Sequence, residues 1–349
     1  MRLARFFVCA LLITASCTSP ASGPSASPTT GGAFVYVLSN STPNVSVIDT
    51  ATRKVIRTAN IPQFTAWTPN DDNNYIDGKN LWLGMHNPDA KDDVHFNDVE
   101  VIALDLDTLT VTYRVPLGKD KLNLFIGKAT KKGVVLVSKM ASGQVVGIDA
   151  KTGTIVSTWD VPIGTGVLCD ADVDTPADGT ERFYYPTREG NTLVAIDTQT
   201  GKPLKTVPFA AGITPWMLTT SPDHKTAWVM EDGSDSNSIV DLVTLEVLKR
   251  FPTGKGPYAA SFSPDGKYGF IGHRREGVMA VIDAHTFAEL QRLALGTYPR
   301  QIAVDNASKY GYVLLTQEHA IVVIELGTWK TVDRIELGSA NPESVHIRR

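Results

Sequence analysis

The sequence FSPDGKYGFIGHRREGVMAVID, from Phe262 to Asp283, contains two strand-like segments joined by a short basic segment. A related sequence, VDNASKYGYVLLTQEHAIVVIE, lies 42 residues further along the chain, from Val304 to Glu325. In both, a Tyr-Gly-aromatic triplet opens the first strand-like segment and a Val-Ile-acid triplet closes the second. This pair predicts a structural unit that recurs along the chain.

The acidic residue of the Val-Ile-acid triplet has counterparts throughout the chain. They are Asp49, Asp105, Asp149, Asp197, Asp241, Asp283 and Glu325. Successive members are separated by 56, 44, 48, 44, 42 and 42 residues. Repeats of about 40–50 residues with several short strands each are typical of β-propellers. The spacing therefore predicts seven repeats of an all-β fold.

Each repeat contains four strand-like segments. In the sixth repeat we expect strands at Ala259–Ser263, Tyr268–Gly272, Val278–Asp283 and Glu289–Leu295. A Pro-Asp-Gly turn precedes the second segment, and the repeat acid, Asp283, precedes the turn to the fourth. An aspartate at such a place accepts hydrogen bonds from the turn amides that follow it. We therefore expect each acid to stabilise the last turn of its own repeat.

The two ends of the repeat region predict how the ring closes. The first repeat begins with AFVYVLSN, which matches a second strand, so its first strand is missing. The last residues, ESVHIRR from Glu343 to Arg349, form a surplus first strand. Pairing the two would remove exposed strand edges. We predict a seven-bladed β-propeller of four-stranded antiparallel blades over residues 33–349, closed by the C-terminal strand.

The sequence of the first repeat supports this fold by resemblance. VYVLSNSTPNVSVIDTATRKVI, from Val35 to Ile56, resembles the YVTN-repeat, or YncE-like, propellers of bacterial surface and periplasmic proteins. The resemblance extends over about Ala33 to Arg349 and implies the fold rather than an activity. The wider superfamily includes the d1-haem propellers of nitrite reductase and the heavy chains of amine dehydrogenases, so the fold alone does not select a function.

The N-terminal residues predict export. Residues 1–16 have the order of a signal peptide: basic residues, the apolar segment Phe6–Ile13, and then small residues. Cys17 follows them, as in a bacterial lipobox, although Thr14 stands where an aliphatic residue is usual. We expect lipidation of Cys17; the alternative is an ordinary cleaved signal.

Residues 17–32 predict a flexible tether. After Cys17 the segment consists of Ser, Thr, Pro, Ala and Gly, a composition that does not bury enough apolar surface to fold. We therefore expect a lipid-anchored protein outside the cytoplasm that contacts the membrane through its anchor. The formal net charge of −4 and the scattered basic residues argue against nucleic-acid binding. We expect a monomer.

A proline precedes the first strand of several repeats and predicts a ring of side chains. The prolines at positions 215, 257, 299 and 342 are spaced by 42, 42 and 43 residues. Because blade symmetry brings equivalent positions to one mouth of the channel, we expect the residues after the prolines to form a ligand-binding ring. These residues are Trp216, Tyr258, Arg300 and Glu343, with Asn70 as a fifth member.

The ring has an alternative interpretation. A guanidinium and a carboxylate at Arg300 and Glu343 suit recognition of a small ligand together with the two aromatic side chains. In the alternative, the same two side chains form a salt bridge between neighbouring blades that only helps to close the propeller. The sequence does not decide between these possibilities.

Histidines in the loops between second and third strands extend the candidate site. His273 and His319 occupy equivalent positions of neighbouring repeats, and we expect both on the same face of the propeller as the residues that follow the prolines. A longer loop, HNPDAKDDVHFND, lies in the second repeat. Its residues His86, His95 and Asp93 could bind a divalent metal ion, although an Asp-rich loop is more often only solvated.

The sequence lacks a recognisable catalytic motif, and we predict no catalytic residue. Our first hypothesis is a non-enzymatic propeller that binds a small molecule or a protein partner on its loop-rich face. The alternative is a periplasmic oxidoreductase, or a subunit of one, that holds a haem or a metal ion near the channel mouth. No Cys-x-x-Cys-His motif for covalent haem is present, and the cofactor is left unassigned.

Overall fold

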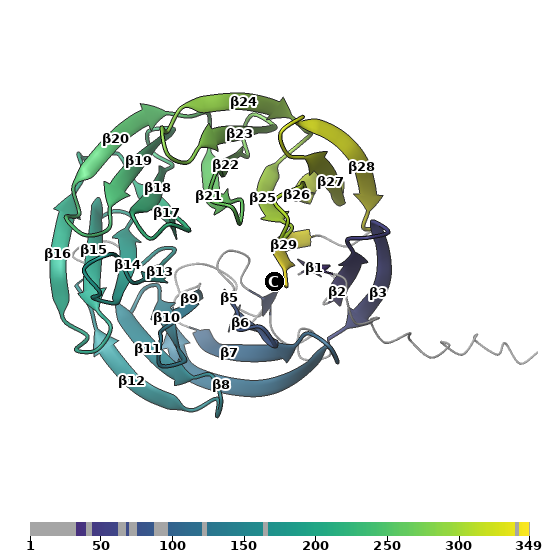
Figure 1. The fold of residues 1–349 in the computed structure, drawn as a ribbon. Helices are drawn as coiled ribbons and strands as arrows, with labels where there is room; N and C mark the ends of the chain where they lie inside the picture. The colour runs from purple at the N-terminus through teal and green to yellow at the C-terminus, as the bar shows by residue number, and fades with distance from the viewer. Residues whose placement is uncertain are drawn as a thin grey trace, which may run out of the picture.

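The structure is a computed structural model of the chain. It describes residues 33–39, 44–61, 68–69, 75–86, 97–120, 124–162, 167–338 and 342–348, with the backbone only at positions 68, 69, 86 and 97. These residues form seven antiparallel sheets arranged as the blades of a ring around a central channel (Figure 1). The predicted seven-bladed β-propeller is confirmed.

In each blade the strands follow one another from the channel outward. Blade 1 contains β29 (Pro342–Ile347), β1 (Phe34–Ser39), β2 (Asn44–Asp49) and β3 (Lys54–Asn60). Blade 2 contains β4 (Thr68–Pro69) and β5 (Tyr75–Ile76), both paired with β6 (Asn80–His86), then β7 (Asn97–Asp105) and β8 (Thr110–Asp120). Blade 3 contains β9 (Leu124–Ala129), β10 (Val134–Lys139), β11 (Gln144–Asp149) and β12 (Ile155–Asp160).

The remaining blades have the same order of strands. Blade 4 contains β13 (Asp172–Asp174), β14 (Arg182–Thr187), β15 (Thr192–Asp197) and β16 (Pro203–Pro208). Blade 5 contains β17 (Pro215–Thr220), β18 (Thr226–Glu231), β19 (Ser236–Asp241) and β20 (Val247–Pro252). Blade 6 contains β21 (Pro257–Phe262), β22 (Tyr268–His273), β23 (Val278–Asp283) and β24 (Glu289–Ala294). Blade 7 contains β25 (Pro299–Val304), β26 (Tyr310–Leu315), β27 (Ala320–Glu325) and β28 (Lys330–Glu336), with a 3-10 turn, η2 (Thr316–Glu318).

Blade 1 joins the two ends of the described chain. Strand β29 pairs antiparallel with β1, from Val35 opposite Ile347 to Leu38 opposite Ser344. The C-terminal strand therefore supplies the innermost strand of the first blade, as predicted, and β1 has a hydrogen-bonded neighbour on both sides.

The hydrophobic core lies between neighbouring blades. In the described residues, seven buried clusters each join two adjacent sheets face to face. The cluster that closes the ring contains Val37 of blade 1, Tyr312 of blade 7 and Val345 of β29. The middle strands are buried on both faces because each sheet packs against two neighbours, whereas the outer strand β3 alternates between exposed and partly buried residues.

Six of the seven acids that revealed the repeat accept hydrogen bonds from turn amides, as predicted, whereas Glu325 accepts a hydrogen bond from the Thr328 hydroxyl at 2.8 Å. Asp283 Oδ1 accepts hydrogen bonds from the backbone nitrogens of His285 at 3.0 Å and Thr286 at 2.7 Å. The hydrogen bond from Thr286 is the main cause that lowers the pKa of the Asp283 carboxyl. Equivalent backbone bonds occur at Asp49, Asp105, Asp149, Asp197 and Asp241.

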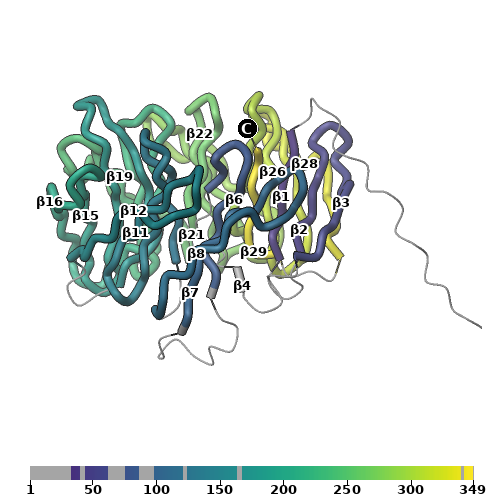
Figure 2. Tube along the Cα trace, turned by 90° about the horizontal axis from the view of Figure 1, so that it is seen from below, coloured from purple at the N-terminus to yellow at the C-terminus, as the bar shows by residue number. Residues whose placement is uncertain are grey.

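Two faces of the ring follow from the antiparallel order. We call the side where the innermost strands begin, at Pro215, Pro257, Pro299 and Pro342, the loop face. We call the opposite side, where the acid turns lie, the turn face. The ring is seen edge-on in Figure 2, where β7 and β8 extend beyond the other blades. In the described part of the chain, no helix is long and apolar enough to cross a membrane.

Candidate functional site

The predicted ring residues lie at the loop-face ends of the innermost strands. Trp216, Tyr258, Arg300 and Glu343 are each the second residue of a strand, in β17, β21, β25 and β29. Repeat spacing alone thus places them at equivalent positions in four consecutive blades. Asn70, the fifth expected member, lies outside the described residues.

Arg300 is engaged inside the protein. Its guanidinium forms a salt bridge with the Glu343 carboxylate of the next blade, and it also donates to the hydroxyl of Tyr258. The centre of the guanidinium lies 4.7 Å from the Tyr258 ring centroid. The Arg300 and Glu343 side chains are only 6% and 11% exposed. The pairing that the sequence left as an alternative is therefore present, and the ligand-binding role of these residues stays a prediction.

Two further arginines, not recognised in the sequence, complete this arrangement. The guanidinium carbon of Arg188 lies 4.0 Å from the Trp216 ring centroid. That of Arg274 lies 6.0 Å from the Trp216 centroid and 5.4 Å from that of Tyr258. Arg274 also donates to Asp232 at 2.9 Å. Cations and aromatic rings thus alternate across blades 4 to 7, an arrangement that stabilises the packing of the inner strands.

The two predicted loop histidines have different surroundings. His273 ends β22 and is fully buried, and burial, followed by the nearby charge of Arg292, lowers its pKa to about 4. His319 follows η2 and is partly exposed. Both lie on the loop face, but neither lines the cavity described below. An uncharged, buried His273 is typical of a packed side chain.

The candidate metal residues fall in the long loop of blade 2. His95 and Asp93 lie outside the described residues, and for His86 only the backbone at the end of β6 is described. In the part of the chain that the structure describes, no group of three or more His, Cys, Asp and Glu side chains is arranged to hold a metal ion. The metal prediction therefore remains a prediction.

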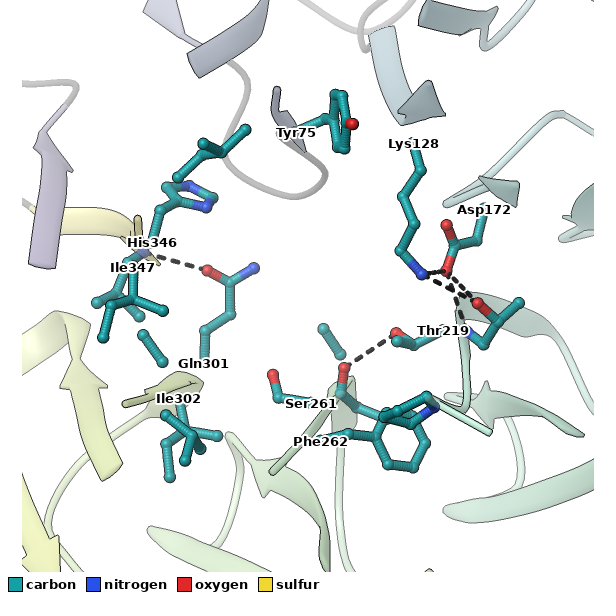
Figure 3. A pocket seen from close by; sticks show the side chains of 18 of the residues that line it. Tyr75, Lys128, Asp172, Thr219, Ser261, Phe262, Gln301, Ile302, His346 and Ile347 are labelled. Carbon is teal, nitrogen blue, oxygen red and sulfur yellow. Dashed lines mark hydrogen bonds and ion pairs between the residues drawn. The ribbon is translucent and has the colours of Figure 1, made fainter. Parts of the chain in front are cut away.

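A cavity of about 440 Å³ lies in the channel, toward the turn face. Its wall is formed by the later residues of the innermost strands, including Ile126, Ala260, Phe262 and Ile302, and by Tyr75 of β5 (Figure 3). Of the predicted ring residues and histidines whose side chains the structure describes, none lines it. The size suits a small organic molecule. The ring predicted from the sequence lies at the other end of the same strands.

One wall of this cavity carries an ion pair that is hydrogen-bonded to a threonine, and the three residues come from three neighbouring blades. Lys128 of β9 donates from Nζ to Asp172 Oδ2 at 2.8 Å and to Thr220 Oγ1 at 3.0 Å. Thr220 donates to the same Oδ2 from its backbone nitrogen at 3.0 Å and from its hydroxyl at 2.8 Å. Asp172 Oδ1 accepts from the Val173 nitrogen at 2.8 Å. The carboxylate is thus held in one orientation by these donors.

The ion pair is exposed on one side. The Lys128 side chain is 48% exposed, whereas the Asp172 side chain is 7% exposed. Lys128 therefore presents its ammonium group to the cavity, while Asp172 lies behind it (Figure 3). An ammonium group has three N–H donors, and two are used in this cluster.

The opposite wall is polar but uncharged. Gln301 of β25 uses its Oε1 to accept a hydrogen bond from the Val345 nitrogen at 3.3 Å. His346 lies beside it in β29, and desolvation lowers its pKa to about 4, so the imidazole is neutral at pH 7 (Figure 3). Ser261 also lines the cavity. The walls therefore offer hydrogen-bonding groups on two sides and apolar groups between them.

One sequence signal points to these residues. The innermost strands of a propeller are short and mostly apolar, so a polar residue there needs a reason: Gln301 in PRQIAV and Thr219-Thr220 in PWMLTT are examples. Lys128 at the end of LFIGKA gives the same signal. Which of these side chains meet depends on the closure of the ring, which the sequence pattern does not contain.

The comparisons with known proteins agree with this fold. Residues 88–309, more than half of the chain, match the YNCE-like beta-propeller family. The chain belongs to this family. The sequence has no significant match among curated proteins.

Solved structures show how widely the YNCE-like architecture is shared. The periplasmic gluconolactonase of Pseudomonas aeruginosa has a TM-score of 0.71 at 16% identity, over 91% of this chain and 99% of that chain. A protein from Lactobacillus plantarum has a TM-score of 0.67 at 15% identity, over 90% and 99%. Hydrazine synthase of Kuenenia stuttgartiensis has a TM-score of 0.63 at 18% identity, over 80% and 89%. At these identities the likeness shows the fold, and proteins of different activity share it.

Proposed function

We propose that this YNCE-like propeller binds a small molecule in the channel cavity and does not transform it. The observation that carries the proposal is the Lys128–Asp172–Thr220 cluster, which is fixed by five hydrogen bonds or ion-pair contacts and faces a cavity of about 440 Å³. Fixed polar groups within a mostly apolar concave wall are typical of small-molecule sites. The Thr220 hydroxyl donates to Asp172 Oδ2, but the same oxygen also accepts from Lys128 and from the Thr220 backbone nitrogen, which makes it a weak base toward that hydroxyl.

The channel cavity is preferred to the loop-face ring for a physical reason. At the ring, Arg300 already has Glu343 and Tyr258 as partners and is almost fully buried, so a ligand would have to replace these contacts. In the cavity, Lys128 is half exposed and offers a donor without such a replacement. A protein partner on the loop face remains compatible with this proposal, but it is not needed to explain the cavity.

We also propose that the protein works outside the cytoplasm as a membrane-anchored monomer. The proposal rests on the signal-like residues 1–16, on Cys17 and on the tether composition of residues 17–32. The described chain begins at Ala33, whose carbonyl accepts hydrogen bonds from Thr50 in a turn-face loop. A tether from a lipid anchor at Cys17 would therefore join the propeller at the turn face. The cavity lies toward the same face.

The binding function can be tested with a variant that fills the cavity. A panel of sugars, sugar acids, sugar phosphates and amino acids would be titrated against the full-length protein by isothermal calorimetry. Ser261→Phe places a ring into the cavity, and we expect it to weaken binding at least tenfold. Arg188→Ala, on the loop face, is the matched control and should leave the affinity unchanged.

Two results would contradict the proposed function. Binding that is lost in Arg188→Ala and kept in Ser261→Phe would assign the ligand to the loop face. Turnover of a panel compound, or a stoichiometric metal ion or visible absorption band in protein purified from its own host, would favour an enzyme and specifically the oxidoreductase alternative.

A further inference from the structure

We infer that the cavity selects uncharged polyhydroxylated molecules, such as simple sugars, over the corresponding sugar acids and sugar phosphates. This inference rests on the proposed function, because it assumes that the channel cavity is the ligand site. It depends on one feature: the positive charge that the cavity presents is compensated within its own wall.

The compensation is visible in the Lys128–Asp172 pair. Lys128 Nζ lies 2.8 Å from Oδ2 of the buried Asp172 carboxylate. Asp172 also accepts three hydrogen bonds from Thr220 and Val173, so it is held in place and cannot turn away from Lys128. The ammonium group would attract a ligand anion beside Lys128. The fixed Asp172 carboxylate, 2.8 Å behind the ammonium group, would repel the same anion.

No other side chain in the described wall adds a net charge to the cavity. Among the described residues that line the cavity, Lys128 and Asp172 are the ionised side chains at neutral pH. His346 is neutral because desolvation keeps its pKa low. The formal charge of this wall is therefore zero. An anion that entered would lose its hydration without gaining a net opposite charge, which is unfavourable.

Hydroxyl groups match the same wall better. A hydroxyl both donates and accepts, so it can accept from the third N–H of Lys128 and exchange hydrogen bonds with Ser261. The C–H face of a sugar ring can pack on the ring of Tyr75, which is partly exposed and lines the cavity (Figure 3). The volume of about 440 Å³ is at the lower end of small-molecule sites, which suits a molecule of sugar size.

Ligands that differ in charge and one substitution test the inference. Each aldohexose would be compared, by calorimetry on the full-length protein, with its aldonate and with the matching hexitol. The hexitol is an open chain like the aldonate and differs from it in having a hydroxymethyl group at C1 in place of the carboxylate. We expect the wild type to bind at least one aldose or hexitol at least tenfold more tightly than the matching aldonate. Asp172→Asn leaves Lys128 uncompensated and should raise aldonate affinity about tenfold.

Two further variants separate charge from damage to the fold. Lys128→Met with Asp172→Asn restores a wall of zero charge, so the gain in aldonate affinity should disappear. If Asp172→Asn does not fold by circular dichroism, Lys128→Met alone gives the test: the wall then carries a negative charge, and aldonate affinity should fall more than aldose affinity.

The outcomes distinguish this inference from the proposed function. Tighter binding of aldonates or sugar phosphates to the wild type, with loss of binding in Ser261→Phe, would overturn the inference and keep the proposed function. Binding of a compound of another class in the same Ser261→Phe-sensitive manner would do the same. If no compound binds in a manner sensitive to Ser261→Phe, the proposed function fails, and the inference fails with it.

Discussion

Replacement of Arg300 by alanine tests whether the loop-face pair serves stability or ligand binding. The substitution leaves the Glu343 carboxylate, 11% exposed, without its counter-charge, and it removes a donor from the Tyr258 hydroxyl. Breaking a buried ion pair by removing one partner costs about 3–5 kcal/mol. For a domain of about 300 residues, the unfolding entropy is about 0.6 kcal/mol/K. We therefore expect the melting temperature to fall by about 5–8 °C.

The assay is thermal unfolding followed by circular dichroism, with urea unfolding as a second measurement. Arg188→Ala is the control, because that side chain also stacks on a ring residue but is 33% exposed. Its loss should be below about 1 kcal/mol. The double variant Arg300→Met with Glu343→Leu removes both charges together and should be more stable than Arg300→Ala.

The reasoning fails if Arg300→Ala melts like the wild type. If the same variant also loses affinity for an anionic ligand, the ring of Trp216, Tyr258, Arg300 and Glu343 is the binding site, as the sequence first suggested. A melting temperature lowered as expected, with ligand affinity unchanged, would assign the pair to ring closure.

Three other predictions follow from closure, burial and targeting. Deletion of residues 343–349 removes most of β29 and exposes the edge of β1, so the protein should aggregate or lose most of its stability; a truncated protein that unfolds like the full chain would contradict this. His273 has a pKa of about 4 when folded against about 6.5 when unfolded, so the unfolded state takes up its proton first as the pH falls. The free energy of unfolding should therefore decrease on acidification from about pH 6.5 to pH 4, by about 3 kcal/mol for this group. His273→Gln should weaken this dependence of the free energy of unfolding on pH, measured by urea unfolding. An unchanged dependence in the variant would show that His273 does not contribute. Cys17→Ala should move the protein from the membrane fraction to the soluble fraction without changing its melting curve, and continued membrane association would rule out the lipid anchor.

The sequence by itself determined the number of blades, the position of each acid turn and the route of closure. These features are local or repeated. An aspartate such as Asp283 bonds to amides two and three residues ahead of it, and a missing strand at Ala33 implies a surplus strand elsewhere. Four expected strand boundaries in the sixth repeat differ from the structure by one or two residues. The largest difference is at β21, which begins at Pro257 rather than Ala259, because a proline can open a strand where no backbone donor is required.

Repetition also has limits as a guide to contacts. Arg292 and Arg334 are 42 residues apart and lie at equivalent places in β24 and β28. Both contact an acid of the preceding loop, Glu276 and Glu318 respectively. Only Glu318, however, also accepts a hydrogen bond from the hydroxyl of Thr297, at 2.9 Å, in the link that precedes β25. The repeat predicts the position of a side chain, and its neighbours decide its partners.

Only the tertiary structure decided which polar side chains share the channel. Lys128 and Asp172 are 44 residues apart, and Lys128 and Thr220 are 92 residues apart, so no window of the sequence contains the cluster. The candidate ring was found because its members share one position in the repeat, whereas Lys128, Asp172 and Thr220 occupy different positions in their strands. They meet because ring closure brings the innermost strands of three successive blades around one axis. The repeat pattern indicated the Arg300–Glu343 pair because both residues share one repeat position, but it carries no information about contacts between different repeat positions in different blades.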